Sequence, residues 1–231
     1  MRIRGIRAVV TGASRGIGAA LARELGRRGA AGLVLAARDA KRLAGVACEL
    51  RGMKTQVEEV AGDVAWPETA GRIAAAAEAL GGLDLVVNNA AVVNEPADLA
   101  TIPDEEWRRI FETNVLGAVR VARATLPLLA RARPGCLLNI SSYWGRAGAA
   151  RFAPYCASKF AIEGLSQSLA EELPETIVCA VNPGVVATDM LATAFGGDVS
   201  GYTSPEECAR GFADLIESLE LADSGRPQTV E

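Results

Sequence analysis

The sequence predicts an α/β protein in which a doubly wound parallel sheet forms the middle layer of a three-layer α/β/α sandwich. Short β-branched runs alternate with alanine-rich helical stretches, and most of the strand-like runs are apolar throughout. Such runs are typical of parallel strands that are buried on both faces. Right-handed crossovers then place helices on both sides of the sheet. The length of 231 residues fits a single domain of this kind.

Each expected element has its own local signal. Short apolar or alternating runs predict strands over residues 5–11, 32–36, 55–60, 83–88, 136–140 and 176–182. Longer stretches of good helix formers predict helices over residues 17–28, 39–51, 67–80, 104–132, 155–172 and 205–219. Pro67 begins one helix, at a position where its missing N–H costs nothing, and Asp39 is expected to cap another. Residues 224–230 can add a seventh strand at the sheet edge.

Composition and charge argue against several classes of partner and chemistry. The net charge is −4 and no basic stripe is present, so we expect no nucleic-acid partner. There is no apolar run of about 18 residues and no apolar signal-peptide core, so we expect a cytoplasmic protein without a membrane span. The absence of histidine excludes Ser-His and Cys-His catalysis. The five cysteines are scattered, so we expect reduced thiols and no metal site.

A glycine-rich segment follows the first expected strand and leads into the first expected helix. It reads TGASRGIG over residues 11–18, with glycines at Gly12, Gly16 and Gly18. Glycines in this position allow a tight turn, and they let backbone N–H groups approach a pyrophosphate at the helix N-terminus. A turn without a ligand is the alternative. The place of the segment at the start of a β-α-β unit favours a Rossmann-like, dinucleotide-binding domain.

Further motifs follow in order along the chain. They are an acidic-apolar pair at Asp63 and Val64, N-N-A over 88–90, N-x-x-G over 114–117, S-x-x-G over 142–145, Y-x-x-x-K over 155–159 and P-G-x-x-x-T over 183–188. With these motifs the chain resembles the short-chain dehydrogenase/reductase family over nearly its whole length. One departure is Ala91, which stands where the family usually has the glycine of N-N-A-G. This substitution bears on the shape of the loop rather than on the function.

The resemblance implies that the cofactor is NADP(H) or NAD(H). The implied cofactor-binding residues are Gly12, Ser14, Arg15, Gly16, Ile17, Gly18, Arg38, Asp63, Val64, Asn89, Ala90, Tyr155, Lys159, Pro183, Gly184, Val186 and Thr188. Asn88 and Asn89 could instead tie neighbouring strand ends together. The second expected strand ends without an acid that could accept hydrogen bonds from a ribose 2′-hydroxyl. Arg38 and Arg15 can both pair with a 2′-phosphate, so we expect NADP(H).

Four residues are the candidate catalytic set. Tyr155 and Lys159 lie one turn apart on a helix, and an ammonium close to a phenol favours the phenolate. Ser141 and Ser142 both follow a strand. The family pattern selects Ser142 for the substrate oxygen, and Ser141 better fits a serine that satisfies backbone groups in a turn. By resemblance, the carbonyl of Asn114 holds a water that relays protons to Lys159; the alternative is an exposed helical asparagine.

These residues indicate an oxidoreductase that transfers a hydride between NADP(H) and a carbonyl or alcohol carbon of a small substrate. By resemblance, residues 189–205 form a short, partly apolar substrate loop. Residues 182–191 and the short C-terminal tail are similar to plant-type NADPH-dependent pterin aldehyde reductases. A non-catalytic NADP-binding sensor is the alternative function, and an epimerase or dehydratase is a further one. The intact set of Tyr155, Lys159, Ser142 and Asn114 favours the enzyme.

Two of the expected helices carry more apolar surface than one face against a sheet requires. They are the helices over 104–132 and 155–172, in which apolar or small residues recur beyond a single stripe. By resemblance, these helices pair with their copies around a two-fold axis. We therefore expect a homodimer, or a homotetramer built from it.

Overall fold

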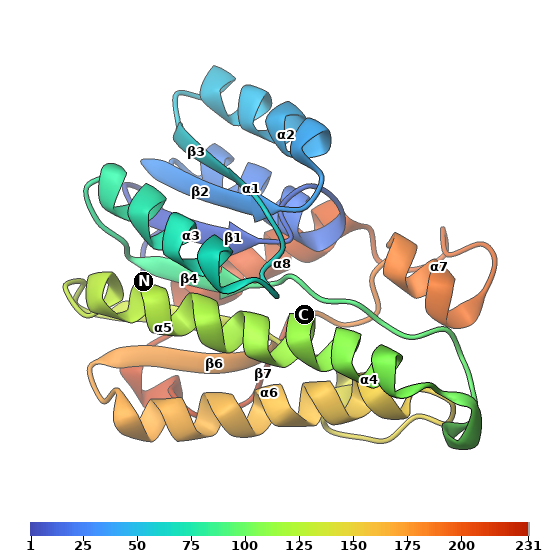
Figure 1. Cartoon of the computed structure of the whole chain (residues 1–231). Coiled ribbons are helices and arrows are strands. Elements are labelled where there is room, and N and C mark those ends of the chain that lie inside the picture. The colour runs from blue at the N-terminus through green and yellow to red at the C-terminus, as the bar shows by residue number, and fades with distance from the viewer. Residues whose placement is uncertain (231) are drawn as a thin grey trace.

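A computed structural model describes residues 1–230, which form a seven-stranded parallel sheet between two layers of helices (Figure 1). The strand order is β3-β2-β1-β4-β5-β6-β7. The strands are β1 (Arg7–Thr11), β2 (Gly32–Ala37), β3 (Gln56–Ala61), β4 (Leu85–Asn88), β5 (Gly135–Ile140), β6 (Thr176–Asn182) and β7 (Gln228–Thr229). The chain leaves β1 first toward β2 and later toward β4, so the order reverses there. This reversal is the point where open α/β sheets place their ligand sites, and it confirms the predicted doubly wound fold.

The helices divide between the two faces of the sheet. They are α1 (Gly16–Arg27), α2 (Ala40–Gly52), α3 (Pro67–Ala79), α4 (Asp104–Phe111), α5 (Gly117–Leu129), α6 (Ala153–Glu172), α7 (Asp189–Phe195) and α8 (Pro205–Ser218). One buried cluster joins α1, α2 and α8 to the sheet, and the other joins α3, α5 and α6 to the opposite face. None of the described helices is both long enough and apolar enough to cross a bilayer.

Alternation along the central strands explains how one sheet supports two cores. In β1, Ala8 and Val10 belong to the cluster with α1 and α8, whereas Val9 belongs to the cluster with α3 and α5. Successive side chains of a strand point to opposite faces, so a strand buried on both sides must be apolar at every position. The apolar runs in the sequence have this origin.

Two features of the fold differ from the sequence prediction. The helix expected over 104–132 is interrupted by a π-helical turn, Glu112–Leu116, which separates α4 from α5. The segment expected to be a loop, 189–205, contains α7, whose first turn is capped by the Thr188 hydroxyl. None of the α7 residues is buried, so the apolar periodicity that reveals a packed helix is missing from this segment. The predicted seventh strand is confirmed as β7, which pairs in parallel with β6.

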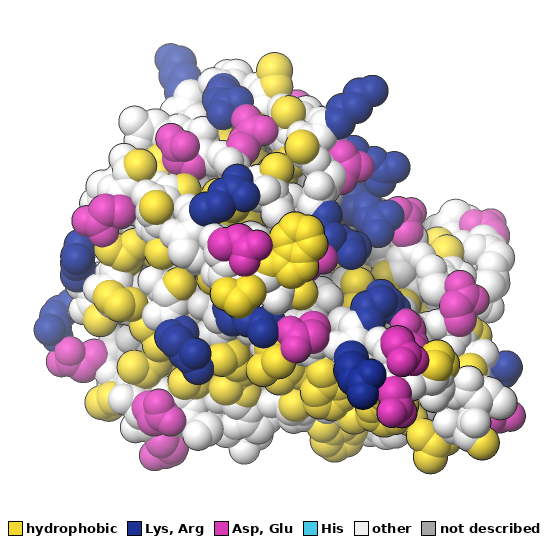
Figure 2. All heavy atoms as spheres, in the orientation of Figure 1, with side chains coloured by type: hydrophobic (Ala, Val, Ile, Leu, Met, Phe, Trp, Pro, Cys, Tyr) yellow, Lys and Arg dark blue, Asp and Glu magenta, His cyan; other side chains and the backbone are white. Residues whose placement is uncertain are grey.

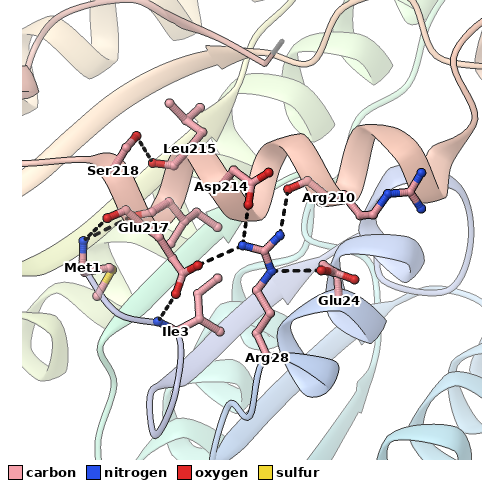
Figure 3. Close-up of polar contacts among 10 residues, drawn as sticks. Met1, Ile3, Glu24, Arg28, Arg210, Asp214, Leu215, Glu217 and Ser218 are labelled. Atoms are coloured by element: carbon pink, nitrogen blue, oxygen red, sulfur yellow. Dashed lines mark hydrogen bonds and ion pairs between the residues drawn. The ribbon is translucent and has the colours of Figure 1, made fainter.

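An ion-pair cluster ties α1 to α8 on the face of the sheet away from α5 (Figure 3). The Arg28 guanidinium lies 2.9 Å from a Glu24 carboxylate oxygen on α1, and it also reaches Asp214 and Glu217 on α8 at 2.7 and 2.9 Å. The Met1 ammonium donates to carbonyl oxygens at the end of α8, including that of Leu219. Because cations stabilise helix C-termini, this contact holds Met1 against the end of α8.

Candidate active site

The motifs of the sequence converge at the carboxyl ends of β1, β4, β5 and β6. The glycine turn follows β1, the Asn89 segment follows β4, the Ser142 segment follows β5 and the Pro183 segment follows β6. The α7 helix projects from the body of the protein at this same end (Figure 1). The fold therefore brings the predicted cofactor and catalytic segments to one edge of the sheet.

The glycine turn is packed against itself and against the segment after β4. A Cβ atom on Gly18 would lie 2.4 Å from the Gly12 carbonyl oxygen and 2.5 Å from Asn89 Nδ2. Gly12 and Gly16 have φ values of 66° and 56°, which glycine adopts without strain. A side chain at any of these three positions would strain or obstruct the turn, so the motif has a local physical cause.

Asn89 and Thr11 brace the turn from below. The Asn89 side-chain amide donates to the Thr11 carbonyl at 2.8 Å, and the Thr11 hydroxyl accepts from the backbone N–H groups of Asn89 and Ala90 at 3.0 Å each. Asn88 donates to Asn139 on the neighbouring strand at 2.9 Å. Both asparagine amides are therefore used to join strand ends, which was one of the two alternatives that the sequence left open.

The N-terminus of α1 has no capping side chain, in contrast to those of α2, α7 and α8. Arg15 occupies the N-cap position without a side-chain hydrogen bond to the backbone, and no acidic residue lies in the first turn. By contrast, α2 is capped by Asp39, as the sequence predicts, at 3.0 Å from the Arg42 N–H. Uncapped N–H groups together with the helix dipole suit a pyrophosphate. The first turn of α1 thus fits the phosphates of a dinucleotide.

The two arginines expected at a 2′-phosphate have acidic neighbours. Arg38 Nη1 lies 3.7 Å from an Asp63 carboxylate oxygen, and Arg15 Nη1 lies 2.7 Å from an Asp189 carboxylate oxygen. Both guanidinium groups are more than half exposed, so these pairs are weak and can exchange partners. Val64 is buried and, together with Ala90 and Gly117, lines a small recess below the turn.

Tyr155, Ser142 and Lys159 come together at the end of β5. The Ser142 hydroxyl accepts from the Trp144 N–H at 3.2 Å, and it lies close enough to the Tyr155 hydroxyl to influence its pKa. Lys159 Nζ donates to the Ile140 carbonyl at 2.7 Å and lies 5.6 Å from the centroid of the Tyr155 ring. Tyr155 and Lys159 are 7% and 3% exposed, so they do not form a solvated pair on a helix face.

Burial determines the protonation of this pair. It raises the pKa of Tyr155 to about 12, against the hydrogen bond from Ser142, which acts to lower it. Burial also lowers the pKa of Lys159 to about 8, and the charge of Glu163 acts in the opposite direction. The sequence analysis expects the Lys159 ammonium to favour the phenolate form of Tyr155. In the structure, the effect of burial on the Tyr155 pKa is larger and favours the phenol. The protein alone holds Tyr155 as a phenol at neutral pH, which is the form that can donate a proton.

Asn114 lies in the π-helical turn and is only 2% exposed, so it is not an exposed helical asparagine. Its side chain accepts from the Val92 N–H at 2.8 Å and donates to the Val92 carbonyl at 2.9 Å and to the Ser158 hydroxyl at 3.0 Å. Ser158 precedes Lys159 on α6. Asn114 thus connects the loop after β4 to the helix that carries Tyr155 and Lys159. Single π-helical turns often occur at functional sites.

The roles of the two adjacent serines are reversed relative to one expectation. Ser142, rather than Ser141, satisfies a backbone group of the following turn. Ser141 is 2% exposed, and its hydroxyl has no hydrogen-bond partner among the described residues. A Cβ atom on Gly145 would lie 2.6 Å from Ser141 Oγ and 3.0 Å from the Lys159 carbonyl oxygen. The close contact between this turn and α6 explains the glycine of the S-x-x-G motif.

The segment after β6 lies beside the glycine turn. Gly184 has φ 78°, Val186 is buried, and a Cβ atom on Gly16 would lie 3.4 Å from Thr188 Cγ2. Ile17 and Ser14 are half-buried in the same turn. The predicted cofactor residues from the two ends of the chain thus share one region.

Aromatic side chains that belong to none of the sequence motifs lie next to the candidate catalytic set. The Trp144 ring packs edge-on against Tyr155 at a centroid distance of 6.0 Å, and Phe195 from α7 lies 5.9 Å from Trp144. Phe195 also stacks on Tyr202 at 6.5 Å. Trp144 could have been identified as a candidate site residue from the sequence, because it follows Ser142 by two residues and lies in the same short turn.

Comparisons with known proteins agree with this geometry. A family model described as short chain dehydrogenase matches residues 7–197. The NADPH-dependent pterin aldehyde reductase of Arabidopsis thaliana is 38% identical over 226 residues, which cover 96% of this chain and 92% of that protein. L-Sorbose reductase from Gluconobacter frateurii, solved with NADPH and L-sorbose, matches with a TM-score of 0.89 and 30% identity over 100% of this chain and 97% of that one. A short chain dehydrogenase from Burkholderia cenocepacia, solved with NADP, matches with a TM-score of 0.90 and 26% identity over 100% and 98%.

Proposed function

The chain belongs to the short-chain dehydrogenase family, and from this premise we propose that it reduces the carbonyl group of a small aldehyde or ketone with NADPH. The observation that carries the proposal is the buried phenol of Tyr155, which lies beside Ser142 and has Lys159 Nζ 5.6 Å from its ring centroid. A tyrosine held in its protonated form is suited to donate a proton rather than to accept one. The reductive direction is proposed because the Arabidopsis thaliana relative is an NADPH-dependent reductase, and a protonated Tyr155 is compatible with that direction.

Each residue of the set has a defined task in this reaction. NADPH supplies the hydride to the carbonyl carbon when it is bound. Tyr155 donates its phenolic proton to the carbonyl oxygen, so that an alcohol forms and the phenolate remains. Ser142 orients the same oxygen through its hydroxyl, and the Lys159 ammonium stabilises the phenolate. Asn114 holds the segment around Lys159 in position through Ser158.

The preference for NADPH over NADH rests on Arg38 and Arg15. Both lie at the edge of the glycine turn region, both are exposed, and each has only a weak acidic partner that a 2′-phosphate can replace. β2 ends at Ala37, and Asp39 is engaged as the cap of α2, so neither residue offers a carboxylate to a ribose 2′-hydroxyl. The uncapped N-terminus of α1 takes the pyrophosphate.

A planar aromatic aldehyde is the substrate class that we favour. The relative from Arabidopsis thaliana is a pterin aldehyde reductase, and the rings of Trp144, Phe195 and Tyr202 form a series of contacts that begins at Tyr155. Aromatic side chains bind flat rings by stacking and edge contacts. The substrate loop over 189–205 would then close over the ring through α7.

The decisive experiment measures oxidation of NADPH with a panel of carbonyl compounds that includes a formyl pterin, benzaldehyde, an aliphatic aldehyde and a ketose. We expect turnover, with higher kcat/KM for the aromatic aldehydes than for the aliphatic one. Tight binding of NADPH without turnover of any compound would instead support the non-catalytic sensor. Equal rates for aromatic and aliphatic aldehydes would contradict the substrate class but not the reaction.

We also infer that two copies of the chain pair through α5 and α6. Figure 2 shows apolar side chains gathered over the region of α4, α5 and α6. Phe160 and Leu116 are 49% and 40% exposed there. Large apolar side chains at such exposure are typical of a covered face.

The five cysteines are all free thiols, which supports a reducing, cytoplasmic location.

A further inference from the structure

Arg146 joins three segments of the chain directly behind the catalytic residues. It follows Gly145 in the turn after Ser142, and its Nε donates to Glu163 Oε1 on α6 at 2.9 Å. Its other nitrogens donate to the Gln228 carbonyl at 2.7 Å and to the Thr229 hydroxyl at 3.0 Å, both on β7. The C-terminal strand is thus tied to the turn that carries Ser142.

The ion pair between Arg146 and Glu163 is largely withdrawn from water. The two side chains are 28% and 9% exposed. A buried ion pair is tolerated where the guanidinium nitrogens have hydrogen-bond acceptors. Here all three nitrogens of Arg146 donate to protein acceptors. The Glu163 side chain is therefore held in a fixed position.

Glu163 lies one helical turn after Lys159, so the two side chains share a face of α6. The elements packed against α6 are α4, the π-helical turn, the turn after Ser142, β5 and β6. Their charged or ionisable side chains, together with those of α6 itself, are Asp104, Glu105, Glu106, Arg108, Arg109, Glu112, Cys136, Tyr143, Arg146, Tyr155, Cys156, Glu163, Glu171, Glu172 and Cys179. Glu112 and Arg109 have ion-pair partners of their own. Glu163 is the group whose charge opposes the effect of burial on the Lys159 pKa.

We propose that Glu163, fixed by Arg146, is a positioning residue that keeps the buried Lys159 side chain charged at the pH of the reaction. Its importance for catalysis rests on the proposed function, in which the ammonium stabilises the Tyr155 phenolate. Glu163 itself does not touch the reacting atoms. Through Arg146, the position of the C-terminal strand also bears on the charge at the active site.

The test is a direct titration of Lys159 by NMR in protein with lysine labelled at Cε. The lysines of this chain are Lys41, Lys54 and Lys159, so few signals appear, and a Lys159→Arg variant assigns the one of interest. In the unaltered protein we expect Lys159 to titrate at about pH 8. Glu163→Gln should lower this value by about half a unit or more, because it removes an opposite charge near the ammonium. Lys41 and Lys54 are exposed and serve as internal standards.

Two matched variants separate the charge of Glu163 from its packing. Glu171→Gln makes the same change at an exposed position on the same helix and should leave Lys159 unchanged. Glu163→Asp keeps the charge and should restore most of the shift; it also serves as the test if Glu163→Gln is too unstable to titrate. An unchanged Lys159 titration in folded Glu163→Gln overturns the proposal, whatever happens to the rate. Because the titration needs no turnover, its result is independent of whether a carbonyl substrate is found.

The kinetic consequence is a change in pH profile. The alkaline limb of kcat/KM for reduction should move to lower pH in Glu163→Gln, because Lys159 loses its proton earlier. A loss of rate by the same factor at every pH would indicate a purely structural role and would also contradict the proposal.

Discussion

The phenol of Tyr155 is the group on which the proposed chemistry depends most directly. Tyr155→Phe removes the proton donor while the ring still packs against Trp144. We expect kcat to fall by about 10²-fold or more, the range of a positioned acid-base group, with little change in NADPH affinity. Steady-state kinetics together with quenching of protein fluorescence by NADPH measure the two quantities.

The matched control for this change is Tyr143→Phe. Tyr143 lies in the same turn as Ser142 but is 63% exposed, so the loss of its hydroxyl should leave kcat within about twofold. If Tyr155→Phe kept a rate within a few-fold of the parent enzyme, Tyr155 could not be the proton donor.

Arg38 is the residue that we expect to decide the choice of cofactor. Arg38→Asp exchanges a partner of the 2′-phosphate for a partner of the 2′-hydroxyl and places a second carboxylate close to Asp63. The kcat/KM for NADPH should fall about tenfold or more, and that for NADH should be spared or improved. Arg131→Asp, an exposed arginine before β5 at the opposite edge of the sheet, is the control. An unchanged NADPH/NADH ratio in both Arg38→Asp and Arg15→Ala would exclude these two residues as readers of the phosphate.

For single residues, the sequence predicts which side chains form the candidate site better than it predicts their pKa shifts and hydrogen bonds. The ordered motifs identify Tyr155, Lys159 and Ser142, and the fold brings these three residues together. The direction of the Tyr155 pKa shift depends on burial, which comes from the packing of Trp144 and the loop after β5. The Y-x-x-x-K motif contains no information about this packing. The hydrogen bond from the Trp144 N–H to the Ser142 hydroxyl likewise cannot be predicted from the sequence, because it exists only once the turn is formed.

At the scale of elements, the contact between the Ser142 turn and α6 sets the geometry of the site. Gly145 is the closest point of this contact. In Gly145→Ala the new methyl group would lie 2.6 Å from Ser141 Oγ and 3.0 Å from the Lys159 carbonyl oxygen, so the turn must move away from the helix. We expect stability to fall by about 1–3 kcal/mol, as in overpacked cores, and kcat to fall with it because Ser142 shifts relative to Tyr155.

Gly148→Ala provides the comparison, since no heavy atom lies within 4 Å of a Cβ at that position. Urea unfolding and kcat measured on both variants test the contact. A Gly145→Ala protein with the stability and rate of Gly148→Ala would mean that the turn accommodates the methyl group and that the contact does not position Ser142.

The elements that the sequence predicts less well are those that form because of contacts with distant residues, or that have no buried residues of their own. The π-helical turn forms where Asn114 binds the Val92 backbone and where Gly117 meets Val64, 2.8 Å from a hypothetical Cβ. These partners are distant in sequence, so helical periodicity alone predicts one continuous helix. The α7 helix, by contrast, has no buried residue and therefore carries no apolar stripe.

At the scale of the whole molecule, the pattern of apolar strands was sufficient to predict the sheet and its two helical layers. The reason is physical: each central strand faces a core on both sides, so alternation of burial cannot appear and the runs stay apolar. What covers the outer faces of α5 and α6 is a different matter, because that surface has no partner within one chain. Its apolar side chains are the basis for the last prediction.

We expect the protein to be a dimer, or a tetramer built from it, that buries the face of α5 and α6 around Phe160 and Leu116. Phe160 is 49% exposed and belongs to neither core cluster, so Phe160→Glu should dissociate the oligomer while the isolated subunit keeps its fold. Leu169→Glu is a poorer probe, because Leu169 packs against the core of its own subunit and a charge there would destabilise it directly. Met53→Glu changes an equally apolar side chain, 39% exposed at the end of α2, and should leave the oligomer intact. Light scattering at micromolar concentration gives the mass of each variant. A parent protein that behaves as a monomer near the chain mass of 24.0 kDa, or a Phe160→Glu variant with unchanged mass, would show that this face is not the interface.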